Sequence, residues 1–289
     1  MFAALPSHIP LHSDTACLEA PAAALWVGQH ALATWALGSL VALGLGALVW
    51  AMAHRLRLPH ERAPLSGPQL VAAHLGVAAV LWVLAGLLLG TLAQQITQGV
   101  GVLVFDHALT ATLRDQLPAS TLHWFLLPTW LGNPATVVVL TVLVTAGLLW
   151  RRQRVLAMGW VAAVVGNAVL NRLLKEWFER ARPLYEHGVL LETGYSFPSG
   201  HASGTLATYG MLAYVVVRLA PRRWHLPAVL AAAWLAWTGA ASRVVLQVHY
   251  ASDVLVGLCN GAAWLALCIL SVELVHRRAP GRFPTRFSR

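Results

Sequence analysis

The chain has 289 residues, of which 58% are hydrophobic and only 11% are charged, and its mean hydropathy is +0.64. A soluble domain usually carries about 25% charged residues, whereas here long apolar runs alternate with short polar ones. The composition therefore excludes an ordinary soluble domain. It predicts an all-α fold, a polytopic membrane bundle of about six to seven transmembrane helices.

The formal net charge of +9 could indicate a nucleic-acid partner, but the placement of the arginines argues against one. Fourteen of the nineteen arginines fall in four short segments at the ends of apolar runs: 55–62, 151–154, 218–223 and 277–289. Such clusters mark the cytoplasmic loops of membrane proteins. We therefore expect the lipid bilayer as a partner and no nucleic acid, while the oligomeric state stays unknown.

Seven apolar segments are long enough, or nearly so, to cross about 30 Å of hydrocarbon as helices. They are 31–53, 70–94, 134–150, 155–174, 202–219, 226–241 and 252–275. The third and sixth are short, and the pair 134–174 could form a tight helical hairpin that turns at 151–154. The stretch 95–133 favours one or two short helices in the headgroup zone, with a plain loop as the alternative.

The loops between these segments alternate in charge, which predicts a topology. The arginine-rich loops should be cytoplasmic, and the outer segments should be 1–30, 95–133, 175–201 and 242–251. An odd number of spans then places the N-terminus outside and the C-terminus in the cytoplasm, in an inner (plasma) membrane. We divide the chain into an N-terminal region with two spans, a core and a basic tail: 1–94, 95–275 and 276–289.

The only lysine, Lys175, closes the fourth apolar segment, and Arg182 follows seven residues later. If the helix continues, seven residues are two turns and both cations project from one face, and Pro183 should end the helix at Arg182. Two cations at a membrane boundary can bind a phosphate. The alternative is ordinary snorkelling of basic side chains to the headgroups.

The sequence Pro198–Ser199–Gly200–His201 directly precedes the fifth apolar segment. Ser199 can cap that helix, and Gly200 lets the backbone approach a ligand. The exposed N–H groups and the helix dipole favour an anion, and His201 can exchange a proton near neutral pH. The alternative is a capped helix with an incidental histidine.

The last group of polar residues lies between the sixth and seventh apolar segments, where Ser242–Arg243 is followed by His249 and Asp253. If one helix includes both, His249 and Asp253 lie on one face, and the carboxylate can hold the ring in one tautomer. An aspartate at a membrane boundary is a functional candidate because burying it without a partner is costly. Capping by Ser252 or Asp253 is the alternative, and it leaves Arg243 and His249 unexplained.

Together these segments resemble the type 2 phosphatidic acid phosphatase (PAP2) family, which shares its site with vanadium haloperoxidases and glucose-6-phosphatase. The resemblance consists of three signatures: Lys175 with Arg182–Pro183, Pro198–Ser199–Gly200–His201, and Ser242–Arg243 with His249 and Asp253. It covers about residues 95–275 and implies a PAP2/haloperoxidase-like helical core, commonly of six helices. The N-terminal helix is additional, and the family does not predict its role.

The resemblance also implies roles for the site residues. His249 would be the nucleophile that forms a phosphohistidine, Asp253 would orient it, and His201 would be the general acid and later the partner in hydrolysis. The groups expected to bind the phosphate are Lys175, Arg182, Ser199, the Gly200 backbone N–H and Arg243. No metal or other cofactor is implied.

The expected reaction is hydrolysis of a membrane lipid phosphate or pyrophosphate at the outer, periplasmic face. Isoprenoid pyrophosphate, phosphatidic acid, phosphatidylglycerophosphate and lipid A phosphate are the substrates we consider. One alternative is phosphate transfer between two lipids, and a haloperoxidase is disfavoured because those relatives are soluble. A non-catalytic lipid-binding or transport protein would be expected to lose a reactive group, and both histidines are present.

Overall fold

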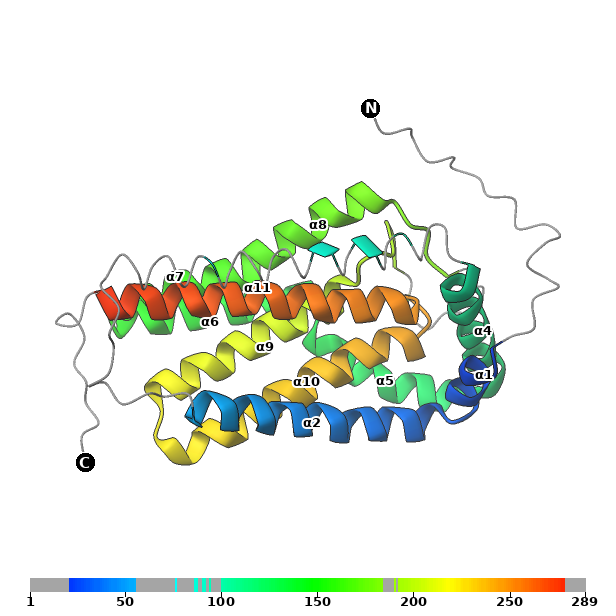
Figure 1. Cartoon of the computed structure of the whole chain (residues 1–289), viewed down its shortest axis with the longest axis horizontal. Coiled ribbons are helices and arrows are strands. Elements are labelled where there is room, and N and C mark those ends of the chain that lie inside the picture. Colours follow the sequence, from blue (N-terminus) through cyan, green and yellow to red (C-terminus); the bar gives the residue numbers. More distant parts are fainter. Residues whose placement is uncertain are drawn as a thin grey trace.

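The computed structural model describes residues 21–55, 76, 86–87, 90–91, 94, 100–183, 190 and 192–278. Over these residues the chain forms helices and no strands. Most of the helices lie side by side along the long axis of the molecule, and α4 lies across one end of them (Figure 1). Five helical stretches in the described part are long and apolar enough to cross a membrane. The predicted all-α membrane bundle is therefore confirmed.

The helices follow one another in the order α1 (Ala22–Gln29), α2 (Ala31–Arg55), α4 (Val100–Gln116), α5 (Ala119–Leu131), α6 (Pro134–Trp150), α7 (Arg154–Val161), η1 (Ala162–Gly166), α8 (Asn167–Phe178), α9 (Gly200–Leu219), η2 (Arg222–Trp224), α10 (His225–Val245) and α11 (Ala251–Arg278). Six of the seven predicted apolar segments coincide with these helices to within a few residues. The predicted span 70–94 lies outside the described residues, apart from six isolated positions.

The helix α9 is not among the five candidate spans, although the sequence predicts a span at 202–219. It lies between α10 and α11 and buries small and polar side chains, including Ser203, Thr205 and Thr208. An interior helix packs against other helices rather than lipid, so it can be less apolar than its neighbours. The number of spans is therefore not confirmed as seven.

The stretch 95–133 contains two helices, so the plain loop is wrong. Helix α4 crosses one end of the bundle, as a helix in the headgroup zone would (Figure 1). Helix α5 differs from this expectation, because it packs against α10 and joins α6 in one apolar stretch of 32 residues, Ala119–Trp150. Asn133 joins the two helices by accepting a hydrogen bond from Ala135 N–H, 2.9 Å away, which caps α6.

The predicted hairpin is present, with α6 and α7 packed against each other across the turn at Arg151–Gln153. Trp160 of α7 is fully buried, and its indole N–H donates to the Thr141 carbonyl of α6 over 3.2 Å. The next turn, η1, is a π-helix, and the indole of Trp264 on α11 donates to its Ala162 carbonyl over 3.0 Å. A π-turn leaves a helix carbonyl available in this way.

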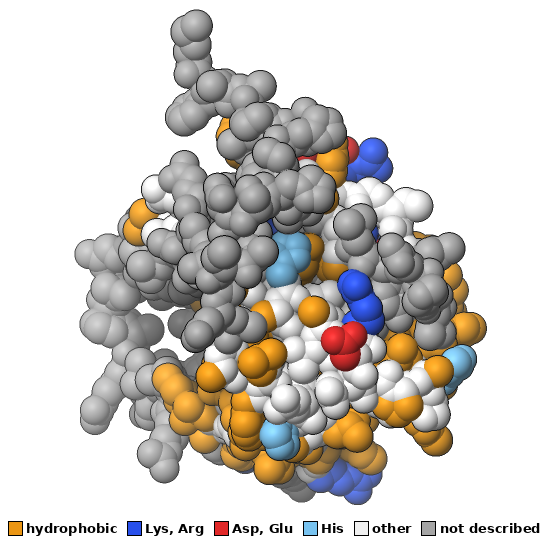
Figure 2. Space-filling model, turned by 90° about the vertical axis from the view of Figure 1, so that its right-hand side faces the viewer, with side chains coloured by type: hydrophobic (Ala, Val, Ile, Leu, Met, Phe, Trp, Pro, Cys, Tyr) orange, Lys and Arg blue, Asp and Glu red, His pale blue; other side chains and the backbone are white. Residues whose placement is uncertain are grey.

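The described helix ends that adjoin the arginine-rich segments lie at one end of the bundle. The C-terminal ends of α2 and α11, the α6–α7 turn and η2 all lie at that end, opposite α4 (Figure 1). Along the sides, large apolar side chains are more than half exposed, for example Leu40, Val49, Leu143 and Leu173. Seen from the α4 end, hydrophobic side chains lie along the lower and right-hand edge of the visible face, and few charged ones lie at its centre (Figure 2). An apolar flank and a basic end fit a bilayer.

Two glycines let α11 approach the start of α9. A Cβ at Gly257 would lie 2.6 Å from the Ser199 carbonyl oxygen, and one at Gly261 would lie 2.8 Å from the Ser203 carbonyl oxygen. Both close approaches are to backbone, which cannot rotate away. The contact therefore fixes the position of Ser199 and of the helix start that follows it.

We expect Gly257→Ala to lower the melting temperature of the purified protein by several degrees, because overpacking costs about 1–3 kcal/mol. The matched control is Gly147→Ala on α6, where a Cβ would meet no described atom within 4 Å. This control should leave the melting temperature unchanged or slightly raised. Equal melting temperatures for both variants would contradict the close approach.

Candidate functional site

The three polar segments found in the sequence meet near the end of the bundle that α4 crosses (Figure 1). Backbone hydrogen bonds join them. The Ser199 N–H donates to the Asp253 carbonyl over 3.0 Å, and the His249 N–H donates to the Arg243 carbonyl over 3.2 Å. Arg182 donates through Nη1 to the Val248 carbonyl over 2.8 Å. The three segments therefore form one site.

His249 lies at the centre of this site and is almost completely buried. Arg182 Nη1 donates toward its Nε2 over 3.2 Å, and Ser196 Oγ lies 3.3 Å from its Nδ1. Ser196 in turn donates to Asp253 Oδ2 over 2.5 Å. Because the Ser196 hydroxyl gives its proton to Asp253, it accepts from His249 Nδ1–H. The network therefore assigns the proton to Nδ1 and leaves the lone pair on Nε2.

The carboxylate of Asp253 acts on His249 largely through Ser196. Its Oδ2 lies 3.6 Å from Nδ1, which is longer than a hydrogen bond. Burial lowers the pKa of His249 to about 4, and the nearby Asp253 opposes this shift. The ring is therefore neutral at pH 7. Ser196 lies in a loop whose sequence gave no signal for this role.

Two local expectations from the sequence are wrong. Helix α8 ends at Phe178, where Glu179 adopts a left-handed backbone with φ 46°, so Lys175 and Arg182 do not share a helix face. Helix α11 begins at Ala251, so His249 precedes it. Asp253 also accepts from the Tyr250 N–H over 3.0 Å, which is the helix capping weighed as an alternative. Capping and contact with His249 thus coexist.

His201 lies in the first turn of α9, which Ser199 caps by accepting from the Ala202 N–H over 3.4 Å. A Cβ at Gly132 would lie 2.8 Å from Cδ2 of the His201 ring, so the glycine after α5 leaves room for the imidazole. No residue of the described part hydrogen-bonds to this ring. A ring without a protein partner can turn to a ligand.

Three cations surround the same region. Arg243 is fully buried, with Nη1 donating to Thr129 Oγ1 over 2.6 Å and Nη2 to Glu192 Oε1 over 2.5 Å. Its Nε is buried and has no partner within the described residues. Glu192 also lies 3.8 Å from Arg182. A carboxylate therefore occupies the position between two arginines where an anion would bind.

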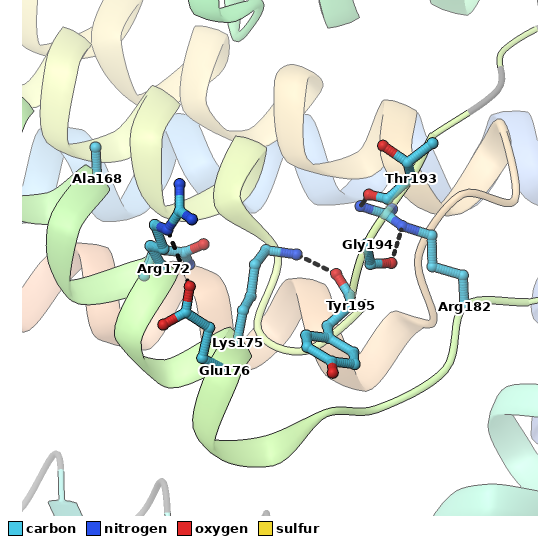
Figure 3. Close-up of a pocket in the computed structure, with 9 residues that line it drawn as sticks. Ala168, Arg172, Lys175, Glu176, Arg182, Thr193, Gly194 and Tyr195 are labelled. Carbon is cyan, nitrogen blue, oxygen red and sulfur yellow. Dashed lines mark hydrogen bonds and ion pairs between the residues drawn. The ribbon is translucent and has the colours of Figure 1, made fainter.

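Lys175 and Arg182 line a pocket of about 310 Å³. Its ammonium group donates to the Tyr195 carbonyl, and the Arg182 guanidinium donates to the Gly194 and Thr193 carbonyls from the far side of the pocket (Figure 3). Gly200 packs against Asn171 of α8, where a Cβ would lie 2.9 Å from Oδ1. The pocket thus lies between α8 and the loop before α9.

The chain matches known proteins over this region. Residues 154–277 match the family model of the PAP2 superfamily. The chain is 30% identical over 212 residues to the lipid A 1-phosphatase of Rhizobium johnstonii, covering 64% of this chain and 82% of that protein. It is 32% identical over 141 residues to phosphatidylglycerophosphatase B of Bacillus subtilis, covering 46% of this chain and 66% of that protein, just under two thirds of its length.

A solved structure has a similar fold. The crystal structure of a transmembrane PAP2-type phosphatidylglycerolphosphate phosphatase from Bacillus subtilis superposes with a TM-score of 0.63 at 27% identity. The superposition covers 68% of this chain and 97% of that one. About two thirds of this chain therefore shares the fold of that structure.

The position of Glu192 generates a prediction. The substitution Glu192→Gln removes the internal anion that competes with phosphate for Arg243 and Arg182. Inorganic phosphate should therefore bind about tenfold more tightly, as measured by calorimetry in detergent. The matched control is Glu273→Gln, which loses an ion pair with Arg218 at the opposite end of the bundle and should not change phosphate binding. Unchanged or weaker binding to the Glu192 variant would contradict the anion site.

Proposed function

The chain belongs to the PAP2 superfamily, and from this premise we propose that it is an integral membrane phosphatase that hydrolyses a lipid phosphate or pyrophosphate through a phosphohistidine. The observation that carries the proposal is the state of His249. Its Nδ1–H donates to Ser196, which in turn donates to Asp253, and its Nε2 carries the lone pair and faces Arg182. A neutral imidazole held in this way is a nucleophile.

In the first step, His249 Nε2 attacks phosphorus as the bond to the leaving oxygen breaks. The leaving oxygen takes its proton from His201. Burial and the nearby Arg243 lower the pKa of this histidine, so it carries the proton only when the negative charge of a bound phosphate offsets them. The product is a phosphohistidine whose ring carries a positive charge, which the contact of Nδ1–H with Ser196 and Asp253 stabilises. The leaving group departs as the lipid alcohol or the lipid monophosphate.

In the second step, water attacks the same phosphorus. His201, now neutral, takes a proton from the water, and the bond from phosphorus to Nε2 breaks. Inorganic phosphate leaves, and His249 returns to its neutral form with the proton on Nδ1. The two histidines thus return to their starting states after one turnover.

The phosphate oxygens are held by cations and backbone donors. The unpartnered Nε of Arg243, the Arg182 guanidinium and the Lys175 ammonium supply positive charge. Ser199 and the Gly200 N–H add the N-terminus of α9. The phosphate takes the position that the Glu192 carboxylate holds in this structure, which supports an anion site there.

The substrate is a lipid that reaches the site sideways from the outer leaflet of an inner membrane. The helix ends that adjoin the arginine-rich segments lie at the opposite end of the bundle, which supports an extracytoplasmic site and a cytoplasmic C-terminus. Isoprenoid pyrophosphate, phosphatidic acid, phosphatidylglycerophosphate and lipid A phosphate are all candidate substrates. The division into 1–94, 95–275 and 276–289 stays a prediction, and the family match lies almost wholly within the second part.

A lipid-to-lipid phosphotransferase is the second candidate, since the phosphohistidine could pass its phosphate to a lipid hydroxyl instead of water. Incubation with a radiolabelled lipid phosphate from the four candidate classes, with and without an acceptor lipid, separates the two. Hydrolysis gives labelled inorganic phosphate, whereas transfer gives a labelled acceptor lipid.

We expect His249→Ala and His201→Ala to reduce phosphate release from the preferred lipid by at least about 10³-fold, because each removes a reacting group. Phosphohistidine hydrolyses in acid, so the phosphoenzyme should be trapped at alkaline pH, where the wild type shows it and His249→Ala has none. Both variants should melt like the wild type. Turnover by His249→Ala at the wild-type rate would remove the proposed nucleophile.

The reaction as proposed uses no divalent metal ion. Phosphate release should therefore be unchanged after incubation with excess EDTA, measured beside a metal-dependent phosphatase as the positive control. Orthovanadate should inhibit, because it mimics the pentacoordinate phosphorus. Loss of activity that added Mg²⁺ restores would contradict this chemistry.

A further inference from the structure

Arg180, two residues before Arg182, turns inward at the end of α8. Its guanidinium is mostly buried, and Nη1 donates to Asp253 Oδ1 over 2.5 Å and to Ser252 Oγ over 2.8 Å. Nη2 donates to Asp106 Oδ2 over 2.9 Å. Arg180 therefore binds the carboxylate that supports His249 on the side away from the ring.

Asp106 comes from α4, outside the residues that match the family model. It is almost completely buried, accepts from the Ser252 N–H over 3.2 Å and also accepts from the Ser252 hydroxyl. The helix that crosses the end of the bundle is thus tied to the first turn of α11. This contact links α4 to the site.

The Arg180 guanidinium is enclosed by protein groups. Its Cζ lies 4.3 Å from the centre of the Tyr250 ring, and that ring packs edge-on against His107 of α4, with 5.1 Å between centroids. Within the described residues, Arg180 thus contacts two carboxylates, a hydroxyl and an aromatic face, and it does not line the pocket. It differs in this respect from Arg182, which lines the pocket.

We infer that Arg180, held by Asp106, is a positioning residue that keeps the Asp253 carboxylate ionised and aimed at Ser196 and His249. The inference rests on the proposed function, since it assigns a cause to the orientation of the proposed nucleophile. Asp253 is fully buried, and a buried carboxylate without a cationic partner takes up a proton. A protonated Asp253 no longer accepts from Ser196, and the ring loses the contact that fixes its tautomer.

The charges of the group favour the intermediate. With neutral His249, the two carboxylates and one guanidinium sum to −1, and the positively charged ring of the phosphohistidine brings the sum to zero. Asp106 therefore does more than fix Arg180 in place, because without its charge the group is neutral before the reaction and positive after it. Because the group is buried, this difference in net charge has a larger effect on the free energy of the intermediate than it would have in water.

The test uses the full-length protein in detergent, with phosphate release from a lipid that the wild type hydrolyses. We expect Arg180→Gln to lower kcat about 30-fold with KM within about twofold, because Arg180 does not touch the substrate. Arg180→Lys should recover at least about fivefold of that loss, since a single ammonium can still pair with Asp253. Asp106→Asn, which keeps the Arg180–Asp253 pair and so protects folding, should lower kcat about fivefold.

The double variant shows whether Arg180 acts through Asp253. Since Arg180 acts through Asp253, Arg180→Gln combined with Asp253→Asn should be no slower than Asp253→Asn alone, within about twofold. If the kcat losses of the two single variants multiply in the double variant, Arg180 has a structural role independent of Asp253, and the inference is overturned. Wild-type kcat in both Asp106→Asn and Arg180→Gln would also overturn it.

Two controls separate this inference from the proposed function. Arg218→Gln removes an arginine from an ion pair with Glu273 at the opposite end of the bundle and should leave kcat unchanged. If His249→Ala is inactive while the Arg180 variants behave like Arg218→Gln, the positioning role fails and the proposed function stands. If His249→Ala retains wild-type turnover, the proposed function itself fails.

Discussion

The buried carboxylate of Asp253 is the group through which the parts of the site are joined. Its side chain accepts from Ser196, the Tyr250 N–H and Arg180, and its backbone carbonyl accepts from the Ser199 N–H. One residue thus connects the loop before α9, the start of α9, the end of α8 and the start of α11. Since an unpaired buried carboxylate is costly, each of these donors also stabilises the fold.

The electrostatics of the site follow from its position at the end of an apolar bundle. Arg243 is fully buried, and Glu192 supplies the carboxylate that makes this tolerable without a ligand. An anion with more negative charge and more acceptor oxygens can replace that carboxylate. The same contacts therefore stabilise the buried arginine and select for a phosphate.

The sequence predicted the helices well and the side-chain geometry less well. Ser199 caps α9 as expected, because capping depends on residues within one turn. Lys175 and Arg182 were placed on one helix face, and this was wrong because Glu179 turns the chain out of the helix. That turn brings Arg180 inward, and the pull of two buried carboxylates on Arg180 is a long-range effect that helix periodicity does not report.

By itself, the sequence determined the membrane bundle and the three segments that hold the polar residues, and it predicted that the arginine-rich loops lie on one side. These follow from hydropathy and charge along the chain, which are local properties. Only the tertiary structure decided which groups pair. Asp106 meets Ser252 across 146 residues, and Arg180 meets Asp253 across 73. Such partners are set by how helices pack, because burial forces each charge to find a complementary group wherever the fold brings one.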